Sequence, residues 1–183
     1  MEFKARLLEI IKEKSYEEGE FKLASGKSSN FYLDCRQTSL DAEGGYLIGK
    51  IFYQMIKKLS LPIAGAGGMT LGADPLASAT SLVSYLEKDP IAAFIVRKEP
   101  KKYGKGLWIE GKGNLKKGDP VVIVEDVVTT GGTLLRVIDR VKEEGLVVQM
   151  ILALVDREEG GREALANAGF NLKTVFTLKD IAG

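Results

Sequence analysis

Histidine is absent from this chain of 183 residues, and cysteine occurs once, at Cys35. Without histidine, the sequence excludes Ser-His-Asp catalysis, Cys-His catalysis and any zinc site built on imidazole ligands. A single cysteine excludes internal disulfides and cysteine-cluster metal sites, and it is typical of a protein in a reducing compartment such as the cytoplasm. We expect Cys35 itself to be a small, passive hydrophobic side chain.

Long apolar runs and an excess of one charge are also lacking. The net charge is +1, from 26 basic and 25 acidic residues, so nothing draws the whole chain toward nucleic acid or a membrane surface. No run is long enough to cross a bilayer. Acidic residues interrupt segment 1–20, which indicates an amphipathic helix and not a signal peptide. We therefore expect a cytoplasmic protein without nucleic-acid or membrane partners.

What the sequence does contain is a regular alternation of predicted strands and helices. Its length fits one domain, 1–183, large enough to bury roughly 70% of the unfolded surface without a disulfide or metal. The expected strands are 20–23 and 31–34, which form a hairpin, then 62–66, 91–96, 121–124, 147–155 and 172–176; the expected helices are 43–59, 76–86, 134–144 and 161–168. This alternation predicts an α/β fold with a parallel sheet, in which ligands bind at the carboxyl ends of the strands.

The most informative segment is VVIVEDVVTTGGT, residues 121–133. An apolar β-branched run predicts a buried strand, and Glu125 and Asp126 follow it directly. Gly131 and Gly132 allow close approach of a ligand to the backbone, and the next helix presents unpaired N–H groups at its positive end. Threonine hydroxyls add donors for a phosphate, while the two carboxylates suit sugar hydroxyls or hydrated Mg²⁺. The segment therefore predicts a sugar-phosphate ligand, with an ordinary strand-to-helix turn as the alternative.

Two other segments are rich in glycine or in positive charge. RKEPKKYGKGLWIEG, from Arg97, is aperiodic and predicts a long loop. Alone it suits a solvated basic loop or a nucleic-acid contact; beside a sugar-phosphate site, it suits neutralisation of a departing pyrophosphate. In GAGGMTLGADP, Gly65 and Gly67 begin a G-x-G-x-x-G count, but Thr70 occupies the third position. A dinucleotide-binding site is therefore weakly supported, and no G-x-x-x-x-G-K-[ST] motif is present.

Segment 121–133 resembles the signature of the type I phosphoribosyltransferases, which bind 5-phosphoribosyl-1-pyrophosphate (PRPP). Four more segments resemble orotate phosphoribosyltransferases: FKLASGKSSNFYLDCR, GGMTLGADPLA, VRKEPKKYGKGLWIEG and LVDREEGGRE. The resemblance implies the type I phosphoribosyltransferase fold, with a central parallel sheet flanked by helices and a small N-terminal hood, about residues 1–40, over the base site. It implies a homodimer with shared active sites, because the basic loop reaches into the neighbouring subunit in this family.

The resemblance also implies roles for individual residues. Arg97, Lys101 and Asp126 would be catalytic, and Thr129 and Arg157 would bind orotate, whose carboxylate matches the arginine fork. The alternative for Arg157 is a surface ion pair with Asp156 or Glu158. Mg²⁺ would be carried mainly by PRPP, with Glu125 and Asp126 as further ligands through water. The residues implied for PRPP are Arg97, Lys98, Lys101, Tyr103, Glu125, Asp126, Val127, Val128, Thr129, Thr130, Gly131, Gly132 and Thr133.

The implied reaction converts orotate and PRPP into orotidine 5′-monophosphate and pyrophosphate, a step of pyrimidine (UMP) biosynthesis. Orotate is anionic and its ring nitrogen deprotonates readily, so a chain without histidine suffices, and catalysis comes from positioning and electrostatics. Ala24 and Tyr103 depart from the lysine and histidine of many members, and Thr70 or Leu71 falls where some members have a lysine in the glycine-rich loop. The alternatives are a purine phosphoribosyltransferase, a PRPP-sensing regulator and an NAD-dependent oxidoreductase.

Overall fold

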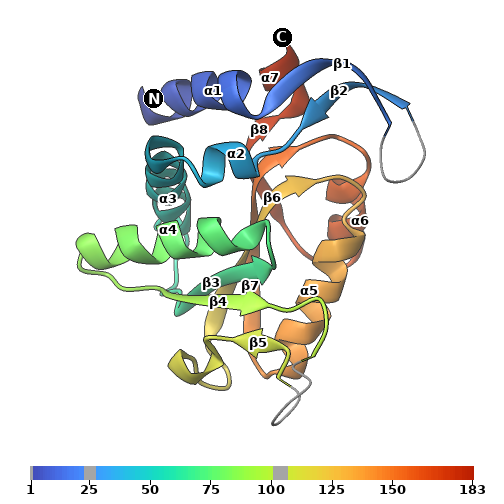
Figure 1. The fold of residues 1–183 in the computed structure, drawn as a ribbon. Helices are drawn as coiled ribbons and strands as arrows, with labels where there is room; N and C mark the ends of the chain where they lie inside the picture. Colours follow the sequence, from blue (N-terminus) through green and yellow to red (C-terminus); the bar gives the residue numbers. More distant parts are fainter. Residues whose placement is uncertain (1, 23–27, 101–106) are drawn as a thin grey trace.

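The computed structural model describes residues 2–22, 28–100 and 107–183, and its largest feature is a six-stranded sheet in the order β5-β4-β3-β6-β7-β8 (Figure 1). The strands are β3 (Gly65–Met69), β4 (Ala92–Val96), β5 (Ile109–Glu110), β6 (Pro120–Val128), β7 (Val147–Asp156) and β8 (Leu172–Thr177). Neighbouring strands are parallel except β5, which pairs antiparallel with β4 at the edge. The predicted α/β fold with a central, mainly parallel sheet is confirmed.

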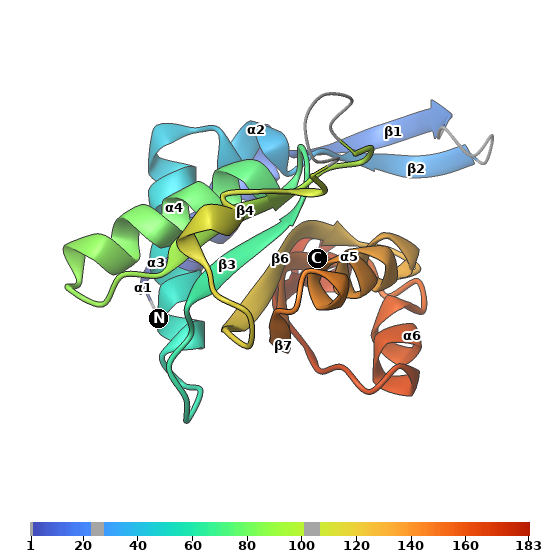
Figure 2. The same cartoon turned by 90° about the horizontal axis from the view of Figure 1, so that it is seen from below.

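Helices cover both faces of this sheet (Figures 1 and 2). The first face carries α1 (Glu2–Lys14), α3 (Ala42–Ile56) and α4 (Ala73–Leu86), and the second carries α5 (Gly132–Glu143) and α6 (Gly161–Asn167). Three short helices complete the described elements: α2 (Arg36–Ser39), η1 (Lys112–Asn114) and α7 (Leu178–Ala182). Within the described residues, none of these helices combines the length and apolar character that crossing a membrane requires.

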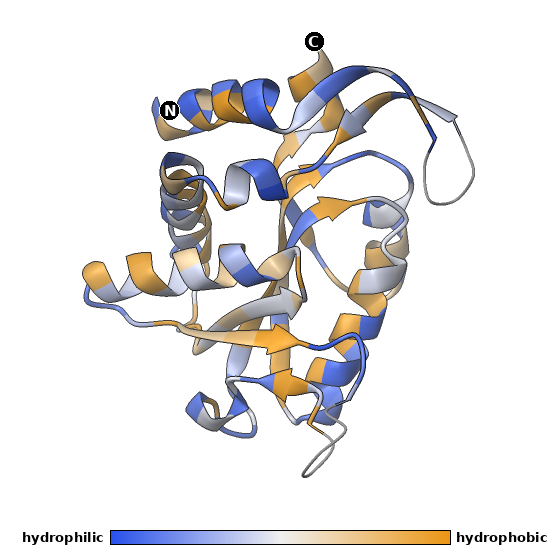
Figure 3. Ribbon diagram, in the orientation of Figure 1, coloured by the Kyte–Doolittle hydropathy of each residue, from blue (hydrophilic) through white to orange (hydrophobic). Residues whose placement is uncertain are grey.

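The sheet separates two hydrophobic cores, and the sequence of β6 shows why. Successive side chains of a strand point to opposite faces. Val122 and Val124 join the core under α1, α3 and α4, while Val121 and Ile123 join the core under α5. Because both faces are covered, all four residues are apolar and fully buried. The arrows of β4 and β6 are orange in Figure 3, whereas the glycine-rich β3 is pale.

A second, two-stranded sheet projects past the carboxyl ends of the large sheet (Figure 1). It is the antiparallel hairpin of β1 (Tyr16–Lys22) and β2 (Ser28–Leu33), in which the rings of Tyr16 and Phe31 stack at 5.9 Å. The first strand begins at Tyr16 and not at residue 20, since α1 already ends at Lys14. Residues 23–27, which include Ala24, lie outside the described residues.

The glycine-rich segment corrects a second prediction. The strand expected at 62–66, with a glycine loop after it, is β3, and the glycines themselves form the strand. A Cβ on Gly67 would collide with the Phe94 carbonyl oxygen and ring, and one on Gly68 with the Val124 carbonyl oxygen. Side chains are therefore excluded at Gly67 and Gly68, where β3 runs closest to β4 and β6, and the loop that approaches the ligand region is confined to residues 70–72.

Candidate active site

Two connected cavities open at the carboxyl ends of the central strands. The smaller, about 110 Å³, is lined by Glu125 and by residues 127–134. The larger, about 410 Å³, is lined by residues 32–36, 69–72 and 125–127 and by Lys98, Thr129, Thr133 and Arg157. Glu125, Val127, Thr129 and Thr133 line both cavities, so a ligand can occupy the two at once.

The small cavity forms where β6 turns into α5. The backbone bends through Thr129 and Thr130, Gly131 takes the left-handed φ of +82°, and α5 begins at Gly132. The positive end of α5 therefore faces the space that residues 127–133 enclose. Gly161 supports this turn from behind, since a Cβ there would lie 2.5 Å from the Thr129 carbonyl oxygen. We call this turn the cup; its geometry suits a phosphate group.

The two carboxylates differ in their surroundings. Glu125 is 7% exposed, and its Oε2 has no hydrogen-bond partner in the described part of the chain. Burial, together with the neighbouring charge of Asp126, raises the pKa of Glu125 well above its ordinary value. Asp126 is half-buried and accepts a hydrogen bond from the Val127 N–H at 2.8 Å. Two carboxylates are an incomplete set for Mg²⁺, which would need water and ligand oxygens beside them.

Arg157 lies between the hairpin and the cup. It follows β7, and its N–H donates to the Val128 carbonyl oxygen at 2.9 Å. The guanidinium packs on the Phe31 ring at 4.9 Å and pairs with Glu159 at 2.7 Å, while its Nε is buried without a partner among the described residues. Among the described residues, Arg157 makes its ion pair with Glu159 and not with Asp156 or Glu158, the partners expected in the alternative. The side chain also lines the cavity that Thr129 lines.

The segment that carries Arg157 is held by the buried carboxylate of Asp156, which pairs with the half-exposed Arg162. Asp156 is 1% exposed and accepts from the Glu158 N–H at 2.8 Å and from Arg162 at 3.0 Å. Arg162 also donates to the Leu172 carbonyl oxygen at 2.8 Å. These bonds tie the start of α6 to β7 and β8, and so fix both Arg157 and the glycine behind the cup.

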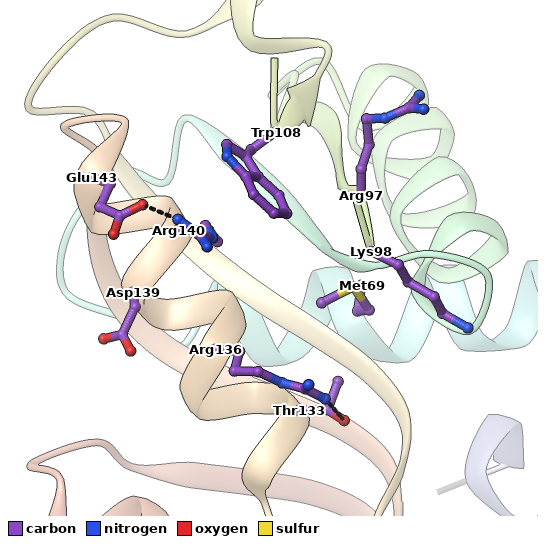
Figure 4. Close-up of a pocket in the computed structure, with 9 residues that line it drawn as sticks. All are labelled: Met69, Arg97, Lys98, Trp108, Thr133, Arg136, Asp139, Arg140 and Glu143. Atoms are coloured by element: carbon purple, nitrogen blue, oxygen red, sulfur yellow. Dashed lines mark hydrogen bonds and ion pairs between the residues drawn. The ribbon is translucent and has the colours of Figure 1, made fainter. Parts of the chain in front are cut away.

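The first two basic residues after β4, Arg97 and Lys98, point in different directions. Lys98 lines the large cavity, but Arg97 does not; it pairs with Glu110 of β5 at 3.0 Å. Figure 4 shows the two side chains extending in opposite directions. Arg97 therefore does not share this cavity with Lys98 within its own chain, because side chains alternate at the end of β4, and its contact with PRPP stays a prediction that involves a second subunit. Lys101 and Tyr103 lie outside the described residues.

Several cavity residues were not predicted individually. Asp34 and Arg36 form an ion pair at 2.7 Å on the hairpin side. On the opposite side, the Thr70 N–H bonds to the Val96 carbonyl oxygen at 2.9 Å, and the Thr70–Leu71 peptide bond is cis. Gly72 approaches Asp126 so closely that a Cβ would lie 2.6 Å from its Oδ1. The sequence identified both segments, but no local pattern selects these side chains.

Cys35 lines the same cavity wall but is fully buried as a free thiol. Burial and the nearby charge of Asp126 raise the pKa of the Cys35 thiol, so it remains protonated and unreactive. The side chain acts as a small hydrophobic group, as the sequence suggested.

Comparison with known proteins agrees with this arrangement. A family model described as "Phosphoribosyl transferase domain" matches residues 71–177. The orotate phosphoribosyltransferase of Aquifex aeolicus is 45% identical, with 96% of each chain covered, and that of Rhodopseudomonas palustris is 43% identical, covering 94% of this chain and 92% of the relative. The Mycobacterium tuberculosis orotate phosphoribosyltransferase in complex with PRPP superposes with a TM-score of 0.81 at 30% identity over 99% of each chain. The chain therefore belongs to the phosphoribosyltransferase family and, within that family, to the orotate phosphoribosyltransferases.

Proposed function

We propose that this chain transfers the 5-phosphoribosyl group from PRPP to orotate, giving orotidine 5′-monophosphate and pyrophosphate in cytoplasmic pyrimidine biosynthesis. The observation that carries the proposal is one connected space with three chemically different walls. The cup suits a phosphate, Glu125 and Asp126 suit ribose hydroxyls, and Arg157 suits a carboxylate on a flat ring.

The proposed mechanism relies on positioning. The cup holds the 5-phosphate, and Asp126 with Glu125 holds the ribose hydroxyls, which fixes the anomeric carbon between the loop at residues 70–72 and Arg157. The Arg157 fork orients orotate so that its ring nitrogen faces that carbon. Lys98 stabilises negative charge as it develops on the leaving pyrophosphate.

Magnesium enters this proposal as an ion carried mainly by PRPP. Asp126, with Glu125 beside it, would hold the Mg²⁺ ion through water. The ion would neutralise charge on the pyrophosphate. The buried, unpartnered Oε2 of Glu125 supports a polar ligand at this place.

The test is incubation of the protein with PRPP, Mg²⁺ and one base at a time. We expect pyrophosphate release with orotate and none with adenine, guanine, hypoxanthine or uracil. Release with a purine alone would favour a purine phosphoribosyltransferase. PRPP binding without release from any base would favour a PRPP-sensing regulator. Binding of NAD without binding of PRPP would favour an oxidoreductase.

We further propose that the working unit is a homodimer with shared sites. The position of Arg97, directed away from the cavity of its own chain, supports this, because a cation at that place is available to a second subunit. Mixing Arg97→Ala chains with Asp126→Asn chains should recover about a quarter of wild-type activity, since half of the randomly exchanged dimers carry one intact site. Recovery no greater than with either variant alone, despite measured subunit exchange, would contradict shared sites.

A further inference from the structure

A second cavity, of about 530 Å³, adjoins the active site between α5 and the arm formed by β4 and β5 (Figure 4). We call it the α5 cavity. It shares Met69, Lys98 and Thr133 with the 410 Å³ cavity, so the two spaces meet at a common rim. Its other lining residues are absent from that cavity; they are Arg97, Trp108, Arg136, Asp139, Arg140 and Glu143. In the proposed mechanism, no part of PRPP or orotate occupies the α5 cavity.

Positive charge dominates the lining. Four basic and two acidic side chains border the cavity, which gives a formal excess of two positive charges. One acid, Asp139, extends from α5 on the side away from Lys98 (Figure 4). The other, Glu143, is engaged by Arg140 at 2.6 Å. Arg97 is likewise engaged by Glu110 at 3.0 Å, so the positive charge of the cavity that is not balanced by an ion pair comes from Lys98 and Arg136.

Two of the basic side chains, Lys98 and Arg136, are available to pair with an anionic ligand. Within the described part of the chain, neither Lys98 nor Arg136 has a carboxylate within ion-pair distance. Arg136 makes one long hydrogen bond, 3.4 Å, to the Thr133 hydroxyl. Like charges held around one space repel each other, and an anion between them relieves that repulsion.

The opposite wall is flat and rigid. The Arg140 guanidinium stacks on the Trp108 ring, 3.9 Å from its centroid, and the ion pair with Glu143 holds it there. The backbone of Trp108 is held by a hydrogen bond, because its carbonyl oxygen accepts the Arg97 N–H at 2.9 Å. This wall supplies a preorganised cation and an aromatic surface on one side of the cavity.

We propose that the α5 cavity binds a diphosphate group. The Arg136 fork pairs with phosphate oxygens in two parallel bonds, and Lys98 adds a point charge across the same space. A single phosphate would leave one of these cations unmatched, whereas linked phosphates reach both. The volume lies in the range of small-molecule sites. The group has two sources: free pyrophosphate, which reaches the cavity over the rim at Lys98, or a nucleoside triphosphate, whose base meets Trp108. Only the first source depends on the proposed function.

Titration calorimetry with pyrophosphate, and separately with ATP, tests the proposal by counting sites. Arg136 is exposed on α5, so Arg136→Gln should fold normally and should bind at the α5 cavity at least about tenfold more weakly. Asp139→Asn should tighten the same site. The matched control is Lys142→Gln, which changes a cation of the same helix that stacks on Phe170 outside the cavity, and its binding should equal that of the wild type.

Trp108 is the one tryptophan in the sequence, so its fluorescence reports on this cavity directly. We expect a saturable fluorescence change in the wild type that is shifted to higher ligand concentration in Arg136→Gln. Stronger binding of pyrophosphate identifies the reaction product as the source, and stronger binding of ATP identifies a nucleotide. Equal numbers of sites and equal affinities in the wild type and Arg136→Gln would overturn the proposal. That outcome is independent of orotate turnover, which is measured on the same samples.

Discussion

Replacing Arg157 with alanine should weaken the use of orotate while leaving PRPP binding nearly unchanged. The carboxylate is the chemical group that distinguishes orotate from uracil, and Arg157 is the cation placed between the hairpin and Thr129 in the large cavity. Its side chain is 15% exposed, so a carboxylate that reaches it leaves most of its water behind. The interaction is then stronger than a surface ion pair.

The expected loss follows from two opposing contributions. A bidentate charge-assisted pair contributes about 1.5–3 kcal/mol. Without substrate, Arg157 already pairs with Glu159, which is 42% exposed; an exposed pair of this kind is worth about 0–1 kcal/mol and partly offsets the gain. The net loss is therefore about 0.5–3 kcal/mol, which corresponds to roughly a twofold to 150-fold fall in kcat/KM for orotate.

Steady-state kinetics for orotate and a direct titration of PRPP on the same variant measure the two effects separately. Arg157→Lys is the matched comparison; it keeps the charge but loses the fork, so its activity should lie between those of the wild type and Arg157→Ala. Glu159→Gln removes the competing partner and should improve orotate affinity. A parallel fall in PRPP binding would show that Arg157 is structural. Unchanged orotate kinetics would refute the assignment and direct attention to Arg36 on the same wall.

Three further predictions concern the residues around the cup. Because the native state keeps Glu125 protonated at pH values where the unfolded chain releases that proton, the free energy of unfolding should fall as pH rises from the ordinary glutamate pKa toward the raised one. Urea unfolding of Glu125→Gln at about pH 5 and about pH 8 should lack this fall, and an equal fall in both proteins would count against the raised pKa. Gly161→Ala should destabilise the fold by about 1–3 kcal/mol and weaken PRPP binding, because its Cβ would press on Thr129; wild-type values of the urea midpoint and of the PRPP titration would contradict this. Arg162→Ala should cost about 1–3 kcal/mol by leaving buried Asp156 without its partner, and should raise KM for orotate more than for PRPP; equal changes in both KM values would argue against a positioning role.

The parts of the fold that the sequence predicts well are those in which one segment contains the whole signal. Leu134, Val137, Ile138 and Val141 repeat at helical spacing, and all four are buried in α5. The valine-rich run of β6 likewise identifies a strand covered on both faces. The sequence predicts a strand at 62–66, whereas β3 spans Gly65–Met69, because glycine has a low strand propensity. The close contacts that require glycine in β3 are made with strands that are distant in the sequence.

In the site, too, the parts that the sequence predicts depend on one segment, and the parts that it does not predict depend on contacts between distant segments. Residues 127–133 line one cavity because their positions follow from a single strand-to-helix turn. The direction of Arg97 was not predictable, because it depends on the alternation at the end of β4 and on Glu110 in a strand that the sequence does not reveal. The sequence does not reveal the α5 cavity either, since its lining residues come from β3, from the segments that follow β4 and precede β5, and from α5, which meet only in the folded chain.

One short segment, residues 156–162, contacts both the cup and the end of β6 and carries Arg157. The Arg157 N–H bonds to the Val128 carbonyl oxygen at the end of β6, and Gly161 packs against Thr129 in the next turn. Both contacts come from the short segment 156–162, which the buried Asp156 closes on itself. In the proposed function, a phosphate in the cup and a carboxylate at Arg157 would therefore share one support. Such a support would hold the two substrates in a fixed relative position, and catalysis by positioning does not require a histidine.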